Sequence, residues 1–272
     1  MLYLVGLGLG DATDITVKGL QVEEFYGKEL TLAERDLVEQ EADEILKHAK
    51  ETDVAFLVVG DPFGATTHSD LVLRAVRAGI PYQVVHNASV MNAVGCCGLQ
   101  MYNFGETVSV VFWTDSWRPE SFYDKILQNR AAGLHTLCLL DLKVKEQSLE
   151  NLMRGKKIYE PPRFMTAAQA AAQLLEIIRR RNECGQDPGL TEDTLCVGVA
   201  RLGAADQEIR TATLAQMSLC DLGTPLHSLV IIGRLHPLEA DMLRLHARDC
   251  DATLTHLRRV QGSEDTAAPG CH

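Results

Sequence analysis

A carboxylate stands between glycines at the end of an apolar run, where residues 58–64 read Val-Val-Gly-Asp-Pro-Phe-Gly. Asp61 can accept hydrogen bonds from a hydroxyl or a cationic group of a ligand. Gly64 has no side chain, so a ligand can lie directly against its backbone. Pro62 fixes its own φ angle and moves Asp61 out of the helical region, as in a tight turn. The stretch therefore predicts either a ligand-binding turn or a plain strand-to-helix turn of an α/β protein.

A second glycine-rich stretch lies at the N-terminus, where Gly6, Gly8 and Gly10 follow five largely apolar residues. Glycines after a strand indicate close backbone approach, either to a ligand or to a neighbouring loop. The GxGxG spacing does not match the GxGxxG fingerprint of dinucleotide-binding proteins, and no acidic residue follows at the expected distance. A nucleotide-binding oxidoreductase is therefore a disfavoured interpretation.

The elements that must position these residues alternate between strands and helices. Residues 54–59 predict a buried strand, and Ser69 is expected to cap a helix that runs to Gly79. Further strands are predicted at residues 2–5, 82–86 and 107–113, and an amphipathic helix at residues 33–50. This alternation predicts a parallel sheet, in which ligands bind at the carboxyl ends of the strands.

The second half of the chain repeats the alternation after a junction near residues 113–118. Thr166 and Gln169 have the spacing of a capping box and predict the start of a long helix. The remaining predictions are a helix from Pro119, a helix from Pro237, and strands at 136–140, 195–200 and 228–232. The expected organisation is a domain at 1–115, a second α/β domain at 116–246 and a disordered tail at 247–272.

Composition limits the function classes. The chain has 272 residues and a formal net charge of −11, which argues against a nucleic-acid backbone or an anionic membrane as partner. Its eight cysteines show no zinc spacing and no CxxC pair, so we expect reduced thiols, no metal site and a cytoplasmic location. No apolar run is long enough to span a membrane.

Several motifs together resemble the diphthine synthase family of the tetrapyrrole methylase superfamily. In order along the chain they are VGLGLGD, VVGDPFGATTHSDL and HNASVMNAVGCCGLQMYNFGETVSVVFWTDSWRPESF, followed by LCLLDLKVKEQSLENL, KIYEPPRFMTAAQAAAQLLEI and LCVGVARLGA. The resemblance extends to about Leu243. The GDPFGATTHS and NASVMNAVG runs are specific to this family, whereas a bare GDP turn would indicate only the superfamily.

The resemblance implies two α/β domains of the tetrapyrrole methylase type, with S-adenosyl-L-methionine bound in a cleft between them. It implies methylation of the 3-amino-3-carboxypropyl histidine of translation elongation factor 2, giving diphthine methyl ester, by an enzyme that is a homodimer. The cofactor-binding residues that it implies are Leu9, Asp61, Gly64, Ser89, Val90, Leu140, Leu202 and His227.

The residue types give these positions two interpretations each. Ser89 and Val90 are expected at a helix N-terminus, where free N–H groups attract a carboxylate. Leu140 and Leu202 would offer apolar surface to the adenine, although leucines next to strands are more often core. His227, just before an apolar strand, reads equally as a structural histidine with its hydrogen bonds satisfied.

No catalytic base is predicted. His68 follows two threonines beside the Asp61 turn and could deprotonate an amine acceptor, but a surface histidine leading into a helix is the simpler interpretation. Arg154, Lys156, Lys157 and Arg163 form a basic cluster near Tyr159, which is read as a solvated loop or as a dock for a protein substrate.

One departure from the family is expected after Val22. Relatives have a longer stretch there, which contains a second strand, whereas this chain continues directly into an acidic helix. The alternatives to an active diphthine-type methyltransferase are therefore a catalytically inactive isoform that only binds cofactor or partner, or a tetrapyrrole methylase.

Overall fold

The computed structural model describes residues 1–9, 38, 42–144, 146, 153–155, 158–247, 253, 255 and 257. They form two compact units: the first comprises Met1–Ala93 and Leu202–Ala205, and the second comprises Val94–Arg201 and the chain from Asp206 onward. The expected discontinuity after Val22 and most of the expected tail lie outside the described residues.

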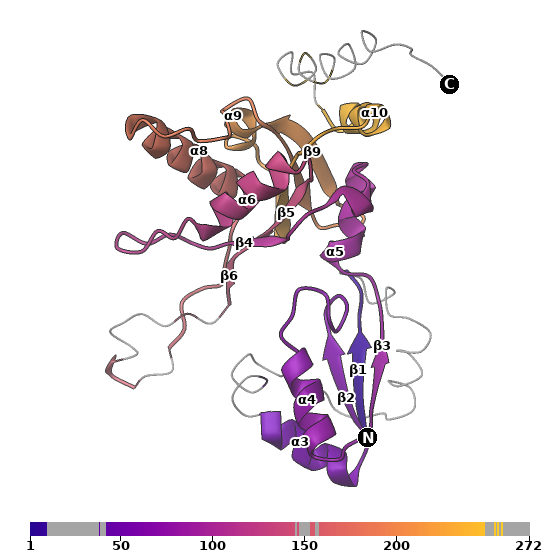
Figure 1. Cartoon of the computed structure of the whole chain (residues 1–272). Coiled ribbons are helices and arrows are strands. Elements are labelled where there is room, and N and C mark those ends of the chain that lie inside the picture. The colour runs from indigo at the N-terminus through magenta and orange to yellow at the C-terminus, as the bar shows by residue number, and fades with distance from the viewer. Residues whose placement is uncertain are drawn as a thin grey trace. The chain divides into compact units, whose positions relative to one another are not determined.

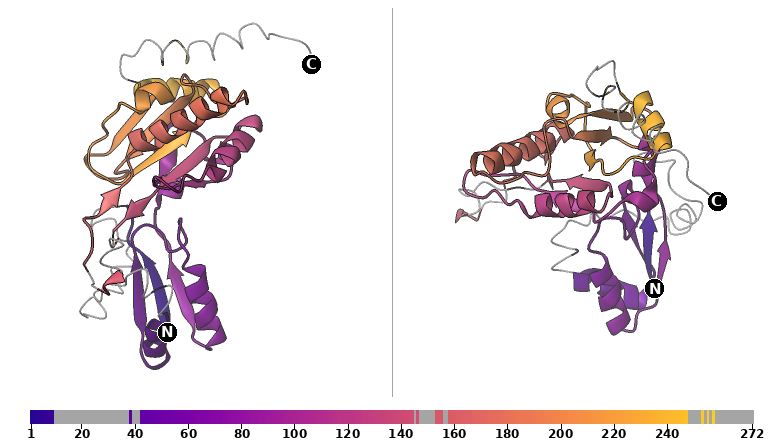
Figure 2. Two further views of the ribbon diagram at one scale, coloured as in Figure 1. Left: turned by 90° about the vertical axis from the view of Figure 1, so that its left-hand side faces the viewer. Right: turned by 45° about the horizontal axis from the view of Figure 1, so that its top comes forward.

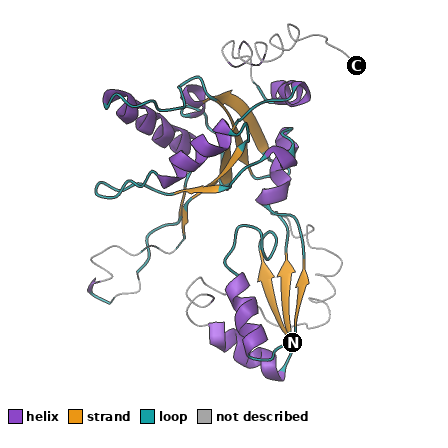
Figure 3. Ribbon diagram, in the orientation of Figure 1, coloured by secondary structure: helices purple, strands orange, loops and turns teal. Residues whose placement is uncertain are grey.

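A three-stranded parallel sheet forms the centre of the first unit (Figures 1 and 3). Strand β1 (Leu2–Gly6) lies between β2 (Val54–Val58) and β3 (Tyr82–Val85), with Leu2 level with both Val54 and Tyr82. The predicted parallel pairing of these strands is confirmed. Because all three run in one direction, the loops after them begin at the same edge of the sheet.

Helices α3 (Ala42–Glu51) and α4 (Ser69–Arg77) pack against this sheet. The buried core of the unit consists of Leu2, Leu4, Ala42, Leu46, Ala49, Phe56, Val58, Leu71, Ala75 and Ile80. Ser69 is the first helical residue of α4 and not its cap, since the N-cap position belongs to His68 and makes no side-chain capping bond. Gly79 follows the helix with φ +70°, as expected for its end.

The second unit is built on a five-stranded sheet in the order β4-β5-β10-β8-β9 (Figure 2). These strands are β4 (Val108–Val110), β5 (Thr136–Leu140), β8 (Leu195–Ala200), β9 (Glu208–Thr213) and β10 (His227–Ile231). Only β4 and β5 run parallel, while the other neighbours are antiparallel. A short loop with no helix joins β8 to β9, so these strands form a hairpin instead of a crossover.

The division between the units differs from the expected boundary near residue 115. Strand β4 was expected in the first domain, but it pairs with β5 in the second sheet, and the first unit ends at Ala93. Of the short elements that follow β3, α5 (Val90–Ala93) therefore belongs to the first unit, and η2 (Val94–Cys97) and η3 (Met101–Asn103) belong to the second.

Helices α6 (Ser121–Ala131) and α8 (Ala167–Glu183) cover the main core of the second unit. The predicted capping box of α8 is confirmed, because Thr166 accepts from the Gln169 N–H and the Gln169 side chain accepts from the Thr166 N–H. The remaining elements are β6 (Leu142–Lys143), β7 (Arg163–Phe164), α9 (Leu214–Met217) and α10 (Pro237–Leu245).

Among the described helices, none combines the length and the apolar content that crossing a lipid bilayer requires.

Candidate functional site

The three loops that leave the parallel sheet of the first unit are bonded to one another. Gly8 and Gly60 exchange two backbone hydrogen bonds, with N···O distances of 3.2 and 2.7 Å. The Asn87 side chain donates to the carbonyl of Gly6 at 3.1 Å. The loops after β1, β2 and β3 thus form one connected edge, which is where ligands bind in sheets of this kind.

Asp61 lies at the centre of that edge. Its Oδ1 accepts from the Phe63 N–H at 2.8 Å, and its Oδ2 accepts from His86 Nδ1 at 2.8 Å and from the Asn87 N–H at 3.1 Å. Burial raises the pKa of the carboxyl, but these hydrogen bonds and the nearby His86 outweigh it and hold the pKa below its ordinary value. The carboxylate therefore ties the β2 loop to the β3 loop.

Gly64 is needed because Ser89 lies against it. A Cβ atom at Gly64 would stand 2.6 Å from the Ser89 Cβ, closer than carbon atoms approach. Ser89 is itself buried, and its N–H donates to Asn92 Oδ1 at 2.8 Å. The bare backbone at Gly64 is thus occupied by the protein's own serine, and the Ser89 N–H that was expected to be free has a partner.

The remaining predicted residues of the first unit are Leu9, Val90 and Leu202. Leu9 ends the described N-terminal stretch and packs near Gly203, which has φ +86° and whose Cβ would meet the Leu9 Cβ at 3.3 Å. Leu202, the residue before Gly203, is buried. Val90 is the first residue of α5, a helix of only four residues.

Leu140 and His227 belong to the second unit. Leu140 ends β5, opposite Val110, and packs half-buried against the main core. The Nδ1 atom of His227 accepts from the Ala167 N–H at 3.3 Å, and its Nε2–H donates to the carbonyls of Gly223 and Thr224, each at 3.0 Å. The buried ring therefore has a full set of partners, one of which is the first N–H of α8, as the structural interpretation expects. A role in cofactor binding stays a prediction for both residues.

The other candidates have ordinary surroundings. His68 Nδ1 donates to the Pro62 carbonyl at 3.0 Å and its ring meets Phe56 edge-on, so this histidine packs into the turn. Of the basic cluster, Arg154 is exposed and Arg163 pairs with Glu146, whereas Lys156 and Lys157 lie outside the described residues.

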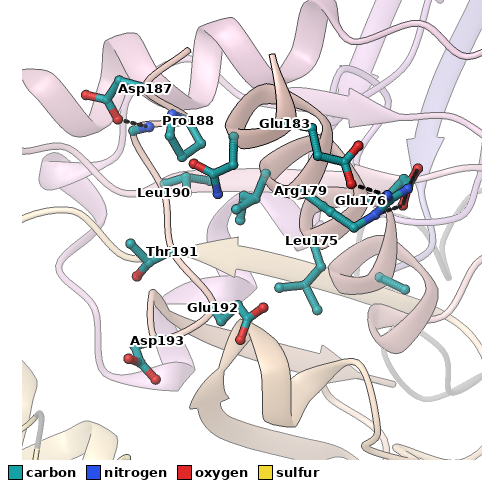
Figure 4. A pocket seen from close by; sticks show the side chains of 14 residues that line it. Leu175, Glu176, Arg179, Glu183, Asp187, Pro188, Leu190, Thr191, Glu192 and Asp193 are labelled. Atoms are coloured by element: carbon teal, nitrogen blue, oxygen red, sulfur yellow. Dashed lines mark hydrogen bonds and ion pairs between the residues drawn. The ribbon is translucent and has the colours of Figure 1, made fainter. Parts of the chain in front are cut away.

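A cavity of about 1020 Å³ opens beside α8, and no predicted site residue lines it (Figure 4). Its lining contains the apolar side chains of Leu175, Ile178 and Leu190 together with several carboxylates. Arg179, which also lines it, is already paired with Glu176 and Glu183. The cavity brings together no set of groups that performs chemistry.

Sequence reasoning missed His86, Asn87 and Asn92, which hold the predicted residues in place. All three lie in the HNASVMNA stretch, from which the sequence analysis took only Ser89 and Val90 as candidates. Their hydrogen-bonding side chains directly after a predicted strand were a usable signal, because polar groups at a strand end face the same edge as Asp61.

Comparisons with known proteins agree with this architecture. The family model of the Tetrapyrrole (Corrin/Porphyrin) Methylases matches residues 23–218. Diphthine methyl ester synthase of Mus musculus is 65% identical over 269 residues, covering 90% of this chain and 96% of that protein. The corresponding protein of Homo sapiens is 64% identical over 269 residues, with 90% and 94% covered.

A solved structure of a similarly named protein also matches most of the chain. The crystal structure of a putative diphthine synthase from Entamoeba histolytica superimposes with a TM-score of 0.76 at 42% identity, covering 92% of this chain and 99% of that one.

The alignment also bears on the expected shortening. The alignment with the mouse protein has 269 positions, but only 90% of this chain's 272 residues, about 245, take part in it. At the other aligned positions the mouse protein has residues and this chain has none. The family match begins at Glu23, the residue directly after the expected discontinuity. From the extent of these similarities, the chain belongs to the tetrapyrrole methylase family, in its group of diphthine methyl ester synthases.

Proposed function

We propose that this chain transfers methyl groups from S-adenosyl-L-methionine to the 3-amino-3-carboxypropyl histidine of translation elongation factor 2, giving diphthine methyl ester. The observation that carries the proposal is the 65% identity to the mouse diphthine methyl ester synthase across 90% of the chain. Because that substrate is a translation factor, we place the enzyme in the cytoplasm, and from the family we infer a homodimer.

The donor supplies a methyl group on a sulfonium, which is already activated toward attack. The protein then has to hold donor and acceptor in line and keep water away, which can provide most of the rate enhancement. A carboxylate acceptor is deprotonated at neutral pH and attacks directly, whereas an amine must first lose its proton. The ester-forming step therefore requires no base from this chain.

The carboxyl edge of the first unit fits such a cofactor in part. Val59, directly after β2, and Phe63, in the turn that follows, are 72% and 41% exposed, so two large apolar side chains stand where a ligand would cover them. Leu9, Val90 and Leu202 would hold the cofactor through backbone groups and apolar contact. Asp61, Gly64 and Ser89 have their main partners within the protein, so we infer that they shape the loops that carry the others.

The test is methyl transfer with S-adenosyl-L-methionine carrying a labelled methyl group. Elongation factor 2 with the 3-amino-3-carboxypropyl histidine is expected to become labelled, and the unmodified factor is not. Part of the label should be released by mild alkali, because esters hydrolyse there and methylated amines do not. Label on uroporphyrinogen in place of the factor would favour a tetrapyrrole methylase.

A catalytically inactive isoform remains the second candidate, because the mouse protein has residues that this chain lacks. Calorimetry separates it from the active enzyme. Binding of S-adenosyl-L-methionine without transfer to the modified factor would support the inactive form. Transfer at the rate of a full-length relative measured alongside it would exclude that form.

A further inference from the structure

His86 and Asp61 form a hydrogen-bonded pair at the carboxyl edge of the parallel sheet. The Nδ1 atom of His86 lies 2.8 Å from Asp61 Oδ2. Burial opposes the ionisation of Asp61, but its hydrogen bonds hold the pKa of the carboxyl below its ordinary value, so at neutral pH the group is a carboxylate that can only accept. The Nδ1 atom must therefore carry the proton of the neutral ring, which leaves a lone pair on Nε2.

The Nε2 atom of His86 is accessible to a ligand. Among the described residues none bonds to this atom, and the side chain of His86 is 68% exposed. The ring lies beside that of Phe63, with the centroids 6.1 Å apart, and Phe63 is itself 41% exposed. The histidine thus belongs to the same uncovered surface that the proposed function assigns to a ligand.

Backbone groups hold the pair in place. Asp61 also accepts from the N–H groups of Phe63 and Asn87, at 2.8 and 3.1 Å. Because Asn87 directly follows His86, the carboxylate is tied both to the ring and to the backbone beside it. A histidine oriented by a second, fixed group is the arrangement that moves protons in catalytic sites.

The amine steps of the proposed reaction require a proton acceptor. Aliphatic amines have pKa values between about 8 and 10.4, so they are protonated at neutral pH. A protonated amine has no lone pair with which to attack a methyl group. The pair of a neutral histidine and a carboxylate has one negative charge, which attracts the ammonium group of the acceptor.

We propose that His86 is the general base that deprotonates the amine acceptor, with Asp61 as the positioning residue that fixes the tautomer of its ring. The inference rests on the proposed function and adds the residue that makes the amine steps possible. It leaves the ester-forming step, in which a carboxylate attacks, independent of His86.

The proton and the electron pairs can be followed through one amine step. The Nε2 lone pair of His86 takes a proton from the ammonium, and the imidazolium that forms is stabilised by the Asp61 carboxylate. The lone pair freed on the amine nitrogen forms the new N–C bond, while the S–C bond of the sulfonium breaks and its electron pair stays on sulfur. His86 then returns its proton to water before the next methyl group is transferred.

His68 fits this role less well. Its Nδ1 donates to the Pro62 carbonyl, which is a neutral acceptor and stabilises an imidazolium less than a carboxylate does. The residue also occupies the N-cap position of α4, where the positive end of the helix disfavours a second positive charge.

The experiment measures transfer of labelled methyl groups, at saturating S-adenosyl-L-methionine, to two forms of elongation factor 2. The first carries the 3-amino-3-carboxypropyl histidine. The second is the wild-type product after mild alkali, which removes the ester, keeps the methylated amine and exposes the carboxylate. His86→Ala should esterify the second form like the wild type. On the first form, it should lose at least roughly 10-fold in alkali-stable label at about pH 7, because at most about a tenth of the amine is then unprotonated.

Two further variants separate a base from a structural residue. Asp61→Asn retains His86, but the amide N–H₂ makes Nδ1 the acceptor and moves the ring proton to Nε2, so the same selective loss is expected. NMR of the ring nitrogens in the free chain should show the Nδ1–H tautomer in the wild type and the Nε2–H tautomer in this variant. The control His48→Ala removes an exposed histidine of α3 and should transfer methyl groups to both forms like the wild type.

Raising the pH supplies unprotonated amine without a base. The amine deficit of His86→Ala should therefore shrink between about pH 7 and 9.5, whereas a deficit from distorted substrate binding would persist. Amine methylation by His86→Ala at the wild-type rate, an equal loss on both forms of the factor, or a deficit that does not shrink would overturn the proposal and leave the proposed function standing. A wild type that labels neither form would overturn the proposed function, and this inference with it.

Discussion

Each unit of the molecule contains a carboxylate that accepts two backbone N–H groups and one histidine N–H. In the first unit, Asp61 holds Phe63, Asn87 and His86. In the second, Glu239 accepts from the Gln100 N–H at 2.9 Å, from the His236 N–H at 2.8 Å and from His135 Nε2 at 3.3 Å.

We call each carboxylate with its three donors a node, and the surroundings of the Asp61 node and the Glu239 node differ. The side chains of His135 and Glu239 are 0% and 1% exposed, whereas those of His86 and Asp61 are 68% and 15% exposed. Water can therefore replace partners lost at the Asp61 node but not at the Glu239 node. The hydrogen bonds of the Glu239 node should thus contribute strongly to the stability of the second unit. Those of the Asp61 node should mainly hold the loops of the first unit in position.

The largest expected effect follows from breaking the buried node. Glu239→Ala leaves three donors without an acceptor in a dry interior and should cost about 3–5 kcal/mol in free energy of unfolding. Denaturant unfolding monitored by Trp113 and Trp117 of the second unit measures it. Asp61→Ala, the matched change in the first unit, should cost about 1–2 kcal/mol. Equal losses would remove the distinction between the two nodes.

The next largest expected loss of stability comes from disturbing the packing of Gly64 against Ser89. Gly64→Ala places a methyl group 2.6 Å from the Ser89 Cβ and should cost about 1–3 kcal/mol. Adding Ser89→Gly removes the colliding carbon and should restore most of that stability. A double variant no more stable than Gly64→Ala alone would show that the glycine serves another purpose, such as contact with the cofactor.

Dependence on pH separates the nodes further. Burial lowers the pKa of His135 more than the attraction of Glu239 raises it, so the folded ring stays neutral where the unfolded chain takes a proton. Stability of the second unit is therefore complete above about pH 6.5 and falls as the pH decreases below it, by at most about 1.4 kcal/mol per pH unit per group. His246, whose pKa burial also lowers, adds to the same trend.

The contribution of the Asp61 node to stability changes with pH in a lower range. The hydrogen bonds that lower the pKa of Asp61 stabilise the fold above about pH 4 and are lost as the pH falls through the folded value. Unfolding measured between pH 7.5 and 5 should show His135→Gln with a shallower slope than the wild type, and Asp61→Asn with an unchanged slope. A wild type whose stability is flat over this range would contradict the role assigned to His135.

These nodes also show how far the sequence alone could predict the molecule. Local signals succeeded: the apolar run before Gly60 is β2, and the Thr166–Gln169 spacing is the capping box of α8. Long-range pairings had no such signal. Glu239 meets His135 across 104 residues, and β4 joins the second sheet through pairing with a strand that follows a whole helix.

For the site, residue types identified the edge but not the partners. Asp61 and Gly64 lie in the predicted turn after β2, whereas their contact with a cofactor stays a prediction. Their contacts with His86 and Ser89 depend on the parallel register of β2 and β3 around β1, which no local pattern encodes. A glycine that admits a ligand and a glycine that admits a neighbouring serine look the same in a sequence.

The smallest expected effect tests whether Asp61 touches the cofactor or only holds its loop. Asp61→Asn keeps the size of the side chain, and its oxygen can still accept from the Phe63 N–H. The amide N–H₂ then faces His86, which can accept by changing tautomer, and the Asn87 N–H, which loses its acceptor. Because water reaches this node, the loss should be about 1 kcal/mol or less in free energy of unfolding.

His86→Ala is the matched control, since it removes one exposed donor and leaves both backbone bonds to Asp61. If Asp61 only fastens the loop, calorimetry should show a modest and similar loss of affinity for S-adenosyl-L-methionine in both variants. A much larger loss in Asp61→Asn, at comparable stability, would show that the carboxylate meets the cofactor directly. In that case the Asp61 node would have two roles, and the Glu239 node only one.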